Sequence, residues 1–475
     1  MKREKLKSAT LFCLVLISVI LTTQIWLDIS IEGIFIMFKK QEVNSNELLS
    51  SNNDKASLIK PEKLILNNNG KHTLLLNETE IGLIYDRILE DTKNMLAIIF
   101  ESKEGIESEK HSMEFMKNLR TGRTIELEYP FAYDYRIYAN MLGAAKAQWE
   151  EIKTIDSVLV GYDSNAVYIV DKTSDSIYEF RSKALRSSIR VMVDMINRSK
   201  TYAYMFLNEV EPEKYGENVL IPINIEDTHT MAKLSSSAET DDDSFESIAV
   251  NFFGGDPSTL RRIVDPSGTV VYTDGERRGG IRMSKAGVIE YVNYSTQSKN
   301  QKDDFTVLDA VNIATNFVNS HMGFPKDSYI SSIEQVAKNN KLYSCTIRYN
   351  YRYEGIPIIN DETIMDNPIE IEIVNGEVKR YKRVVKDIKM TGEGKIIKNP
   401  LDEIIDIVLK RLSYDKNIDI DDIKIKDIQL SYFEYKLEGT TSMIPVWVIE
   451  AGGDTGAAGR YILNAESGVI LSEPY

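Results

Sequence analysis

Residues 369–384 read IEIEIVNGEVKRYKRV, and this stretch decides the fold class of the C-terminal part of the chain. Apolar and polar side chains alternate before and after Asn375-Gly376, as they do in strands with one buried face. Asn and Gly both tolerate positive φ, which a two-residue hairpin turn requires. The stretch therefore predicts a β-hairpin with strands over residues 369–374 and 378–384.

The same order of elements occurs twice around this hairpin. A helix is predicted from Thr306, which forms a capping pair with Asp309, and another from Asn399-Pro400, a cap followed by a first-turn proline. Each helix precedes alternating strands, an Ile-Pro pair and a hairpin: 343–353, 356–357 and 369–384, then 425–435, 444–445 and 461–471. The repeated order predicts two helix-plus-antiparallel-sheet modules, over residues 303–395 and 396–475.

The part of the chain before these modules reads as two further domains. Asn69-Gly70 predicts another hairpin. The first domain, residues 61–205, is expected to be mixed α/β, with helices over 78–99 and 134–148 and strands over 123–129, 157–160 and 167–170. The second, residues 206–302, is expected to be β-rich, with strands over 248–253, 261–264, 269–273, 281–283 and 288–294. Residues 219–225 contain Pro222 and fit a bulged or edge strand at best.

The N-terminus predicts a membrane anchor. Four cations and one acid precede an uncharged, mostly apolar run over residues 8–27. As a helix this run is about 30 Å long, the thickness of a bilayer core. The basic start places residues 1–27 as a cytoplasmic start plus a transmembrane helix, with the remainder extracellular. Residues 28–60 are expected to be a juxtamembrane tether.

A cleaved signal peptide is the alternative interpretation of the same residues. The basic start fits it, but the apolar run exceeds a signal h-region of about 7–15 residues, and no A-x-A-like site follows. We therefore expect the segment to be retained as an anchor in the cell membrane.

One face of the predicted membrane helix is the candidate partner-binding site. Leu11, Val15, Ser18 and Thr22 share that face, and the two hydroxylated residues permit close helix packing and interhelical hydrogen bonds. The alternative is a generic anchor whose hydroxyl groups bond back to their own helix.

Composition restricts the function of the remainder. The whole chain has a net charge of −15 and residues 1–27 carry +3, so the remainder carries −18. This charge argues against nucleic acid as a partner because phosphates repel an acidic surface. An apolar content of 43% and a charged content of 27% suit globular domains. Cys13 lies in the predicted membrane segment and Cys345 lies far from it in the chain, so the two cysteines are not expected to form a disulfide, and a disulfide-stapled scaffold is excluded. The histidines show no zinc-ligand spacing, so neither a metal nor a cofactor is expected; they are His72, His111, His229 and His321.

Motifs that could indicate catalysis have simpler explanations. Asp454-Thr455-Gly456 spells an aspartic protease triplet, but those enzymes need two facing aspartates, and glycines rather than an apolar strand precede it. The acidic cluster around residues 415–422 lacks the glycine and glutamate of a calcium loop. We expect residues 454–456 to lie in a flexible loop and the acidic side chains around residues 415–422 to be solvated. We also expect that the protein is not an enzyme.

Two stretches resemble a known family. The opening MKREKLKSATLFCLVLISVILT (residues 1–22) and residues 251–294, NFFGGDPSTLRRIVDPSGTVVYTDGERRGGIRMSKAGVIEYVNY, resemble the YycH family of extracytoplasmic regulators. The C-terminal modules look like the PepSY-like α+β units of that family. The resemblance covers most of the chain in order, and its motifs carry no chemistry.

The resemblance implies a function and partners. Members of that family modulate the essential sensor histidine kinase YycG, also called WalK, together with the sibling regulator YycI, through transmembrane contacts. The expected protein is thus α+β, with one transmembrane helix and a multidomain ectodomain ending in two PepSY-like modules, and it tunes a two-component system. The alternative is an extracytoplasmic binding or protease-inhibitor module of the cell envelope.

Overall fold

The computed structural model describes most of the chain that follows the predicted membrane segment. The described ranges are 54–77, 82–144, 146–185, 187–197, 203–223, 230–237, 242–253, 258, 260–274, 279–295, 305–339, 341–359, 367–396, 401–416, 418–437, 440–453 and 459–473. The predicted membrane helix, with Leu11, Val15, Ser18 and Thr22, lies outside the described residues. No helix within the described ranges is long and apolar enough to cross a bilayer.

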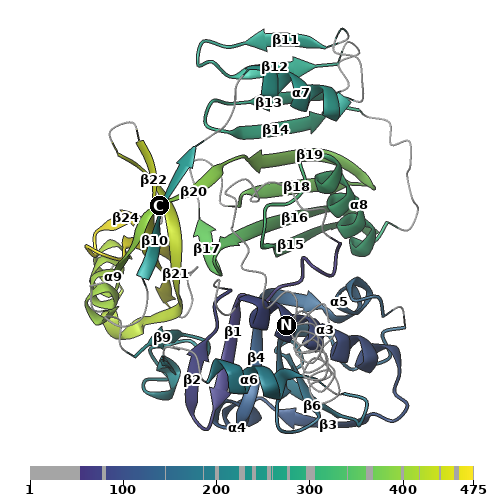
Figure 1. The fold of residues 1–475 in the computed structure, drawn as a ribbon, viewed down its shortest axis with the longest axis vertical. Helices are drawn as coiled ribbons and strands as arrows, with labels where there is room; N and C mark the ends of the chain where they lie inside the picture. Colours follow the sequence, from purple (N-terminus) through teal and green to yellow (C-terminus); the bar gives the residue numbers. More distant parts are fainter. Residues whose placement is uncertain are drawn as a thin grey trace, which may run out of the picture.

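The N-terminal unit is a nine-stranded antiparallel sheet with the strand order β3-β7-β6-β5-β4-β1-β2-β8-β9 (Figure 1). Its strands are β1 Lys63–Asn68, β2 Lys71–Leu74, β3 Glu107–Ser112, β4 Arg123–Asp134, β5 Thr154–Gly161, β6 Ala166–Asp171, β7 Ser176–Arg181, β8 Tyr204–Phe206 and β9 Leu220–Pro222. Its helices are α3 Gly82–Glu101, α4 Phe115–Thr121, α5 Tyr135–Met141, α6 Ile189–Ile196 and the 3₁₀ turn η2 Leu207–Glu209.

Both faces of this sheet are covered because its central strands are apolar on both sides. Val158 and Ile169 pack in the large core with α3, α5 and α6. Their neighbours Leu159 and Ile177 face the opposite way and pack with residues of α4. Successive side chains of a strand point to opposite faces, so a fully apolar run binds helices on both sides.

The remaining strands form one fifteen-stranded sheet with the order β11-β12-β13-β14-β19-β18-β16-β17-β21-β22-β10-β20, where β15 lies beside β16, β23 beside β22 and β24 beside β23. The strands are β10 Thr230–Ser237, β11 Arg261–Val264, β12 Val270–Thr273, β13 Gly279–Met283, β14 Val288–Asn293, β15 Ser328–Lys338, β16 Lys341–Tyr353, β17 Ile356–Ile359, β18 Ile369–Val374, β19 Glu377–Val384, β20 Asp387–Ile396, β21 Ile423–Leu437, β22 Thr440–Gly453, β23 Gly459–Asn464 and β24 Ile470–Ser472. The helices are α7 Asp242–Phe253, α8 Val307–Ser320, α9 Leu401–Lys416 and the 3₁₀ turn η4 Ile420–Asp422.

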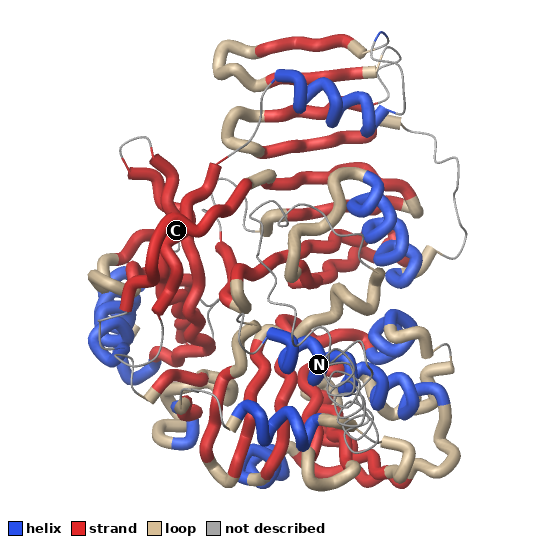
Figure 2. The backbone as a smooth tube through the Cα atoms, viewed as in Figure 1, coloured by secondary structure: helices blue, strands red, loops and turns tan. Residues whose placement is uncertain are grey.

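This sheet contains the same motif three times: a helix followed by four antiparallel strands (Figure 2). The first unit is α7 with β11–β14, the second α8 with β15, β16, β18 and β19, and the third α9 with β21–β24. Strands β14 and β19 join the first two units edge to edge. Strand β17 joins the second to the third, because it pairs with β16 on one side and runs parallel to β21 on the other.

The first of these units differs from the sequence prediction in one element. Residues 248–253 were expected to form a strand, and they form the second half of helix α7. Phe245, Ala249 and Phe252, spaced i, i+4 and i+7, place one helical face against β12 and β13. A short apolar run does not by itself distinguish a strand from a buried helix.

The alignment of the two predicted modules is also wrong in detail. Strand β16 is the second strand of its unit, whereas β21 is the first strand of its own, so residues 343–353 and 425–435 are not equivalent. The two prolines differ likewise, since Pro357 lies in the connecting strand β17 and Pro445 in β22. The α+β class is confirmed; the PepSY-like identity of the terminal units and the domain boundaries stay predictions.

Local predictions from turn chemistry are confirmed. Asn69 and Gly70 have φ of 52° and 75°, and Asn375 and Gly376 have φ of 49° and 81°. Each pair closes an antiparallel hairpin. Strand β9, which contains Pro222, is the last strand of its sheet, so it is the predicted edge strand.

Candidate functional site

The first described residues lie between two units of the structure. This lead-in segment, residues 54–63, connects the N-terminal sheet to everything that precedes it in the chain. Leu58 and Ile59 are fully buried, and the carbonyl oxygen of Leu58 accepts a hydrogen bond from the Ile330 amide at 3.0 Å. A segment held in this way cannot move without disturbing the units on both sides.

Charged groups fasten the same segment to the second unit. The ammonium of Lys60 lies 2.6 Å from Asp327. The guanidinium of Arg352 donates to the Pro61 carbonyl oxygen at 2.6 Å and stacks over Tyr329, with 4.0 Å from its central carbon to the ring centroid. Hydrogen bonds from a charged donor are stronger than neutral ones, so these contacts fix the path of the lead-in segment.

The lead-in segment ends in a charged junction between the N-terminal sheet and the third unit. Lys63 is buried, and its ammonium lies 2.5 Å from Asp427 of β21 and 3.9 Å from Glu128 of β4. It also donates to the carbonyl oxygen of Asn218 at 3.2 Å. Burial alone would lower the pKa of Lys63, but the surrounding carboxylates outweigh it and hold that pKa above its usual value.

A second ion pair completes the charged junction. Arg120 makes a bidentate pair with Glu126, at 2.7 and 3.1 Å, and both side chains are buried. The same guanidinium donates to the carbonyl oxygen of Glu217 and to the side chain of Asn218, each at 2.8 Å. Arg120 therefore positions the loop that carries Asn218, and through it the environment of Lys63.

That loop also binds the third unit through its backbone. The amide of Gly216 donates to the Ile425 carbonyl oxygen at 2.8 Å, and the Ile425 amide donates to the Lys214 carbonyl oxygen at 2.9 Å. A Cβ at Gly216 would lie 2.9 Å from the carbonyl oxygen of Lys426, so only glycine permits this approach. The junction thus couples the lead-in segment, the N-terminal sheet and β21.

Glu62 is a carboxylate of the charged junction whose pKa is raised by burial. Its carboxylate accepts a hydrogen bond from Gln429 of β21 at 3.3 Å. Removal of the carboxyl group from solvent, followed by repulsion from Asp427, raises the pKa of Glu62 to about 7, although Lys63 acts in the opposite direction. The group therefore changes its charge near neutral pH.

Replacing Glu62 by Gln is expected to weaken the pH dependence of stability. An acid whose pKa rises on folding binds more protons in the folded state, so its contribution is present below about pH 4.5 and is lost as pH rises through about 7. Wild type should therefore lose more stability than Glu62→Gln between about pH 5 and pH 8, as measured by urea unfolding. Glu90→Gln, an exposed change on α3, is the control; equal pH dependence of both variants would contradict the expectation.

The residues that the sequence singled out fall elsewhere. The partner-binding face Leu11, Val15, Ser18 and Thr22 and the triplet at residues 454–456 lie outside the described residues. Cys345 is free and buried, and burial raises the pKa of its thiol to about 12. Asp415 pairs with Arg411 at 2.9 Å, and Asp419 caps the η4 turn.

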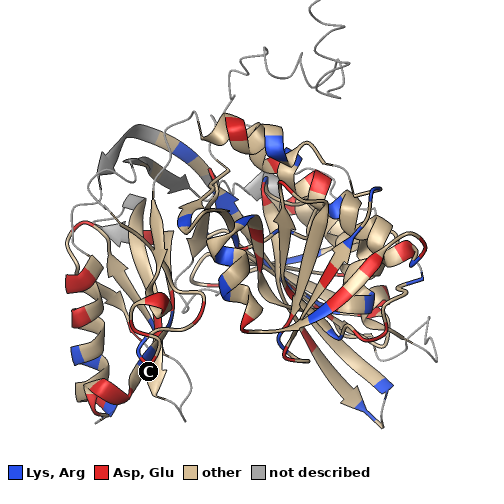
Figure 3. Ribbon diagram, turned by 90° about the horizontal axis from the view of Figure 1, so that it is seen from below, with Lys and Arg blue, Asp and Glu red and all other residues tan. Residues whose placement is uncertain are grey.

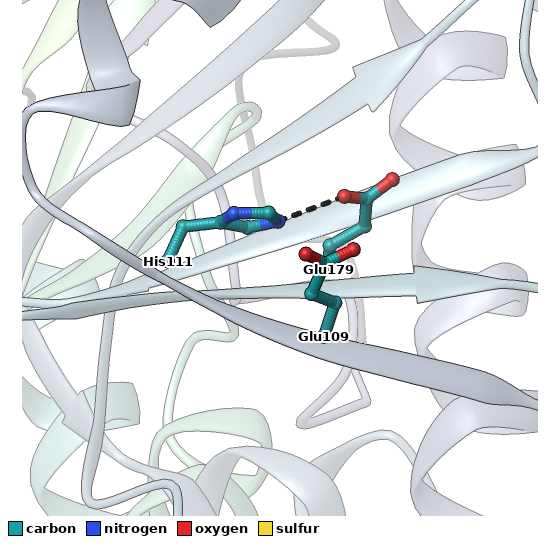
Figure 4. A group of neighbouring side chains, drawn as sticks. All are labelled: Glu109, His111 and Glu179. Atoms are coloured by element: carbon teal, nitrogen blue, oxygen red, sulfur yellow. Dashed lines mark hydrogen bonds and ion pairs between the residues drawn. The ribbon is translucent and has the colours of Figure 1, made fainter.

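The structure brings together residues that sequence reasoning did not group. Lys63 and Asp427 are separated by 364 positions, and no local pattern connects them. Glu109, His111 and Glu179 form the group within the described ranges whose side chains could hold a metal ion (Figure 4). Glu109 and His111 alternate along one strand, which places both side chains on one face, but this pattern has none of the histidine and cysteine spacing of a zinc motif.

The comparisons with known proteins concern the family and the fold. The family model "YycH protein, C-terminal domain" matches residues 218–462. The crystal structure of YycH from Bacillus subtilis is similar with a TM-score of 0.53 at 13% identity, covering 87% of this chain and 99% of that chain. An uncharacterized protein from Eubacterium rectale gives a TM-score of 0.35 at 14% identity, over 55% of this chain and 91% of that one. No curated protein sequence matches.

Proposed function

This chain belongs to the YycH family, and from that membership we propose that it is a membrane-anchored extracytoplasmic regulator of a YycG/WalK-like sensor histidine kinase. The family model covers half of the chain, and the fold resembles that of the Bacillus subtilis protein over nearly its full length. Family membership supports a regulatory role in the YycG/WalK system, and it is the observation that carries the proposal.

The proposed mechanism is a contact between transmembrane helices. The predicted helix over residues 8–27 would pack against the kinase helices and favour one of two signalling conformations. A regulator shifts such an equilibrium only as far as its affinities for the two states differ. The face formed by Leu11, Val15, Ser18 and Thr22 would supply that difference.

The lead-in segment supports a role for the ectodomain in this mechanism. It is clamped between the N-terminal sheet and the second unit, and it ends in the charged junction with the third. A change in the packing of these units would therefore alter the position of residue 54 and of the chain before it. The ectodomain would modulate the kinase by this route, without covalent chemistry.

The proposed partners follow from the same reasoning. They are the kinase, a YycI-like sibling regulator and the membrane that holds residues 8–27. Figure 3 shows Lys and Arg scattered among Asp and Glu over the described units in this view. Basic and acidic residues interspersed along a chain of net charge −15 do not suit nucleic acid, which binds to clustered basic residues.

Replacing the small side chains of the proposed helix face by bulkier ones tests this function. Ser18→Leu/Thr22→Leu should reduce co-purification with the kinase from membranes by about tenfold while membrane insertion persists, because leucine is apolar but too bulky for close packing. Leu14→Ile/Leu21→Ile on the opposite face is the control. Unchanged co-purification and kinase output in both variants would refute the helix contact and place recognition in the ectodomain.

A further inference from the structure

Three side chains gather at the outer edge of the N-terminal sheet. Glu109 and His111 occupy alternate positions of edge strand β3, so both point to the same face, and Glu179 of β7 lies directly opposite Glu109. Figure 4 shows the three side chains converging, with His111 Nε2 2.9 Å from Glu179 Oε2. One ligand atom from each residue lies within 4.8 Å of the other two.

The charges of this group favour a bound cation. Two carboxylates directly opposite each other on neighbouring strands repel, and Glu179 is only 3% exposed. Arg181 pairs with Glu179, and the Arg181 side chain is 60% exposed to solvent. A cation between the carboxylates would neutralise both, whereas Arg181 contacts only the buried one in this structure.

His111 is held ready for such a role. Its ring stacks on Phe115 of α4, with centroids 4.1 Å apart and planes inclined by 17°. The stacking fixes the ring plane with Nε2 directed at the carboxylate of Glu179. A ligand whose orientation is fixed before binding loses little freedom when the ion arrives.

We propose that Glu109, His111 and Glu179 form a binding site for a divalent transition-metal ion of the zinc type. Imidazole and carboxylate are zinc ligands, while Ca²⁺ and Mg²⁺ prefer oxygen ligands alone. Bonds of about 2.0–2.2 Å place tetrahedral ligand atoms roughly 3.4 Å apart. The ligand atoms of this group lie within 4.8 Å of one another, so ion binding would draw them together by up to roughly 1.4 Å. Three protein ligands leave the fourth position to water.

The site would have a structural consequence. Strand β3 pairs only with β7 in the described sheet, and an ion bound by both strands would add a second connection at that edge. Metal binding competes with Arg181 for the buried carboxylate. Removal of the guanidinium should therefore increase the affinity for the ion.

Zinc titration of the untagged, purified full-length chain by calorimetry tests the site. One Zn²⁺ should bind per chain, Mg²⁺ should not compete, and both His111→Ala and Glu109→Gln should weaken binding at least about tenfold. Arg181→Gln should strengthen it, and Glu104→Gln, an exposed carboxylate before β3, should leave it unchanged.

The variants keep the test decisive. Glu109 is exposed, so Glu109→Gln preserves the fold even if His111→Ala disturbs the packing of Phe115. Failure of wild type to bind Zn²⁺, or equal binding by wild type and Glu109→Gln, would overturn the proposal and leave a hydrogen-bonded His–Glu pair. Neither result depends on whether the protein regulates a kinase.

Discussion

Lys63→Met is expected to lower the free energy of unfolding by about 3–5 kcal/mol, the usual cost of removing one partner from a buried ion pair. Methionine fills a similar volume, so the loss arises from charge. Without the ammonium, Asp427 and Glu128 remain close together at the junction, 2.5 and 3.9 Å from where the nitrogen stood. Urea unfolding of the purified protein measures the change.

A matched substitution at an exposed lysine shows how much of this destabilisation is specific to the buried ion pairs of Lys63. Lys426→Met removes an exposed ammonium from the same strand as Asp427 and should change stability by less than about 0.5 kcal/mol. Adding Glu128→Gln to Lys63→Met should recover part of the loss, because one of the unpaired charges disappears. Similar unfolding curves for Lys63→Met and Lys426→Met would show that the junction does not depend on its cation.

Gly355→Ala is expected to destabilise the protein by about 2–5 kcal/mol, for two reasons that add. Gly355 has φ of +80° in the turn between β16 and β17, a conformation that costs alanine about 1–2 kcal/mol. A Cβ there would also lie 2.3 Å from the backbone nitrogen of Asn77, and overpacking costs about 1–3 kcal/mol. The clashing atom belongs to backbone, so no side-chain rotation relieves it.

Gly70→Ala provides the comparison for the conformational part alone. Gly70 has φ of +75° in its hairpin turn, yet a Cβ there meets nothing within 4 Å. Gly70→Ala should therefore lower the free energy of unfolding by only about 1–2 kcal/mol. Equal destabilisation of both variants in urea would show that the turn at Gly355 moves away from Asn77 without cost, so that the two units do not need this close approach.

Sequence reasoning succeeded where the determining interactions are local. Thr306 and Asp309 form the predicted reciprocal cap at the start of α8. The buried side of α9 contains Leu401, Ile404 and Val408, as the helical spacing predicts. In each case the residues that determine the structure lie within a few positions of one another.

Prediction from the sequence was wrong where one local pattern is compatible with either a strand or a helix. Residues 248–253 have apolar character that suits a strand, and only packing against β12 and β13 decides for helix α7. Strand β15 was missed, and with it the correct equivalence of the repeated units. Its second half is exposed, so the sequence there shows little apolar alternation.

The sequence by itself determined the α+β class, the two Asn-Gly hairpins, the helices α8 and α9 and the family. Only the tertiary structure decided which charges share the junction, why Gly355 must be glycine, and that His111 faces two glutamates. Hairpins and caps arise from neighbours in the chain, whose interactions form in any conformation that brings a few residues together. The junction exists because folding removes Lys63 and its carboxylates from water together, although Asp427 lies 364 positions away, and that desolvation is a property of the assembled units.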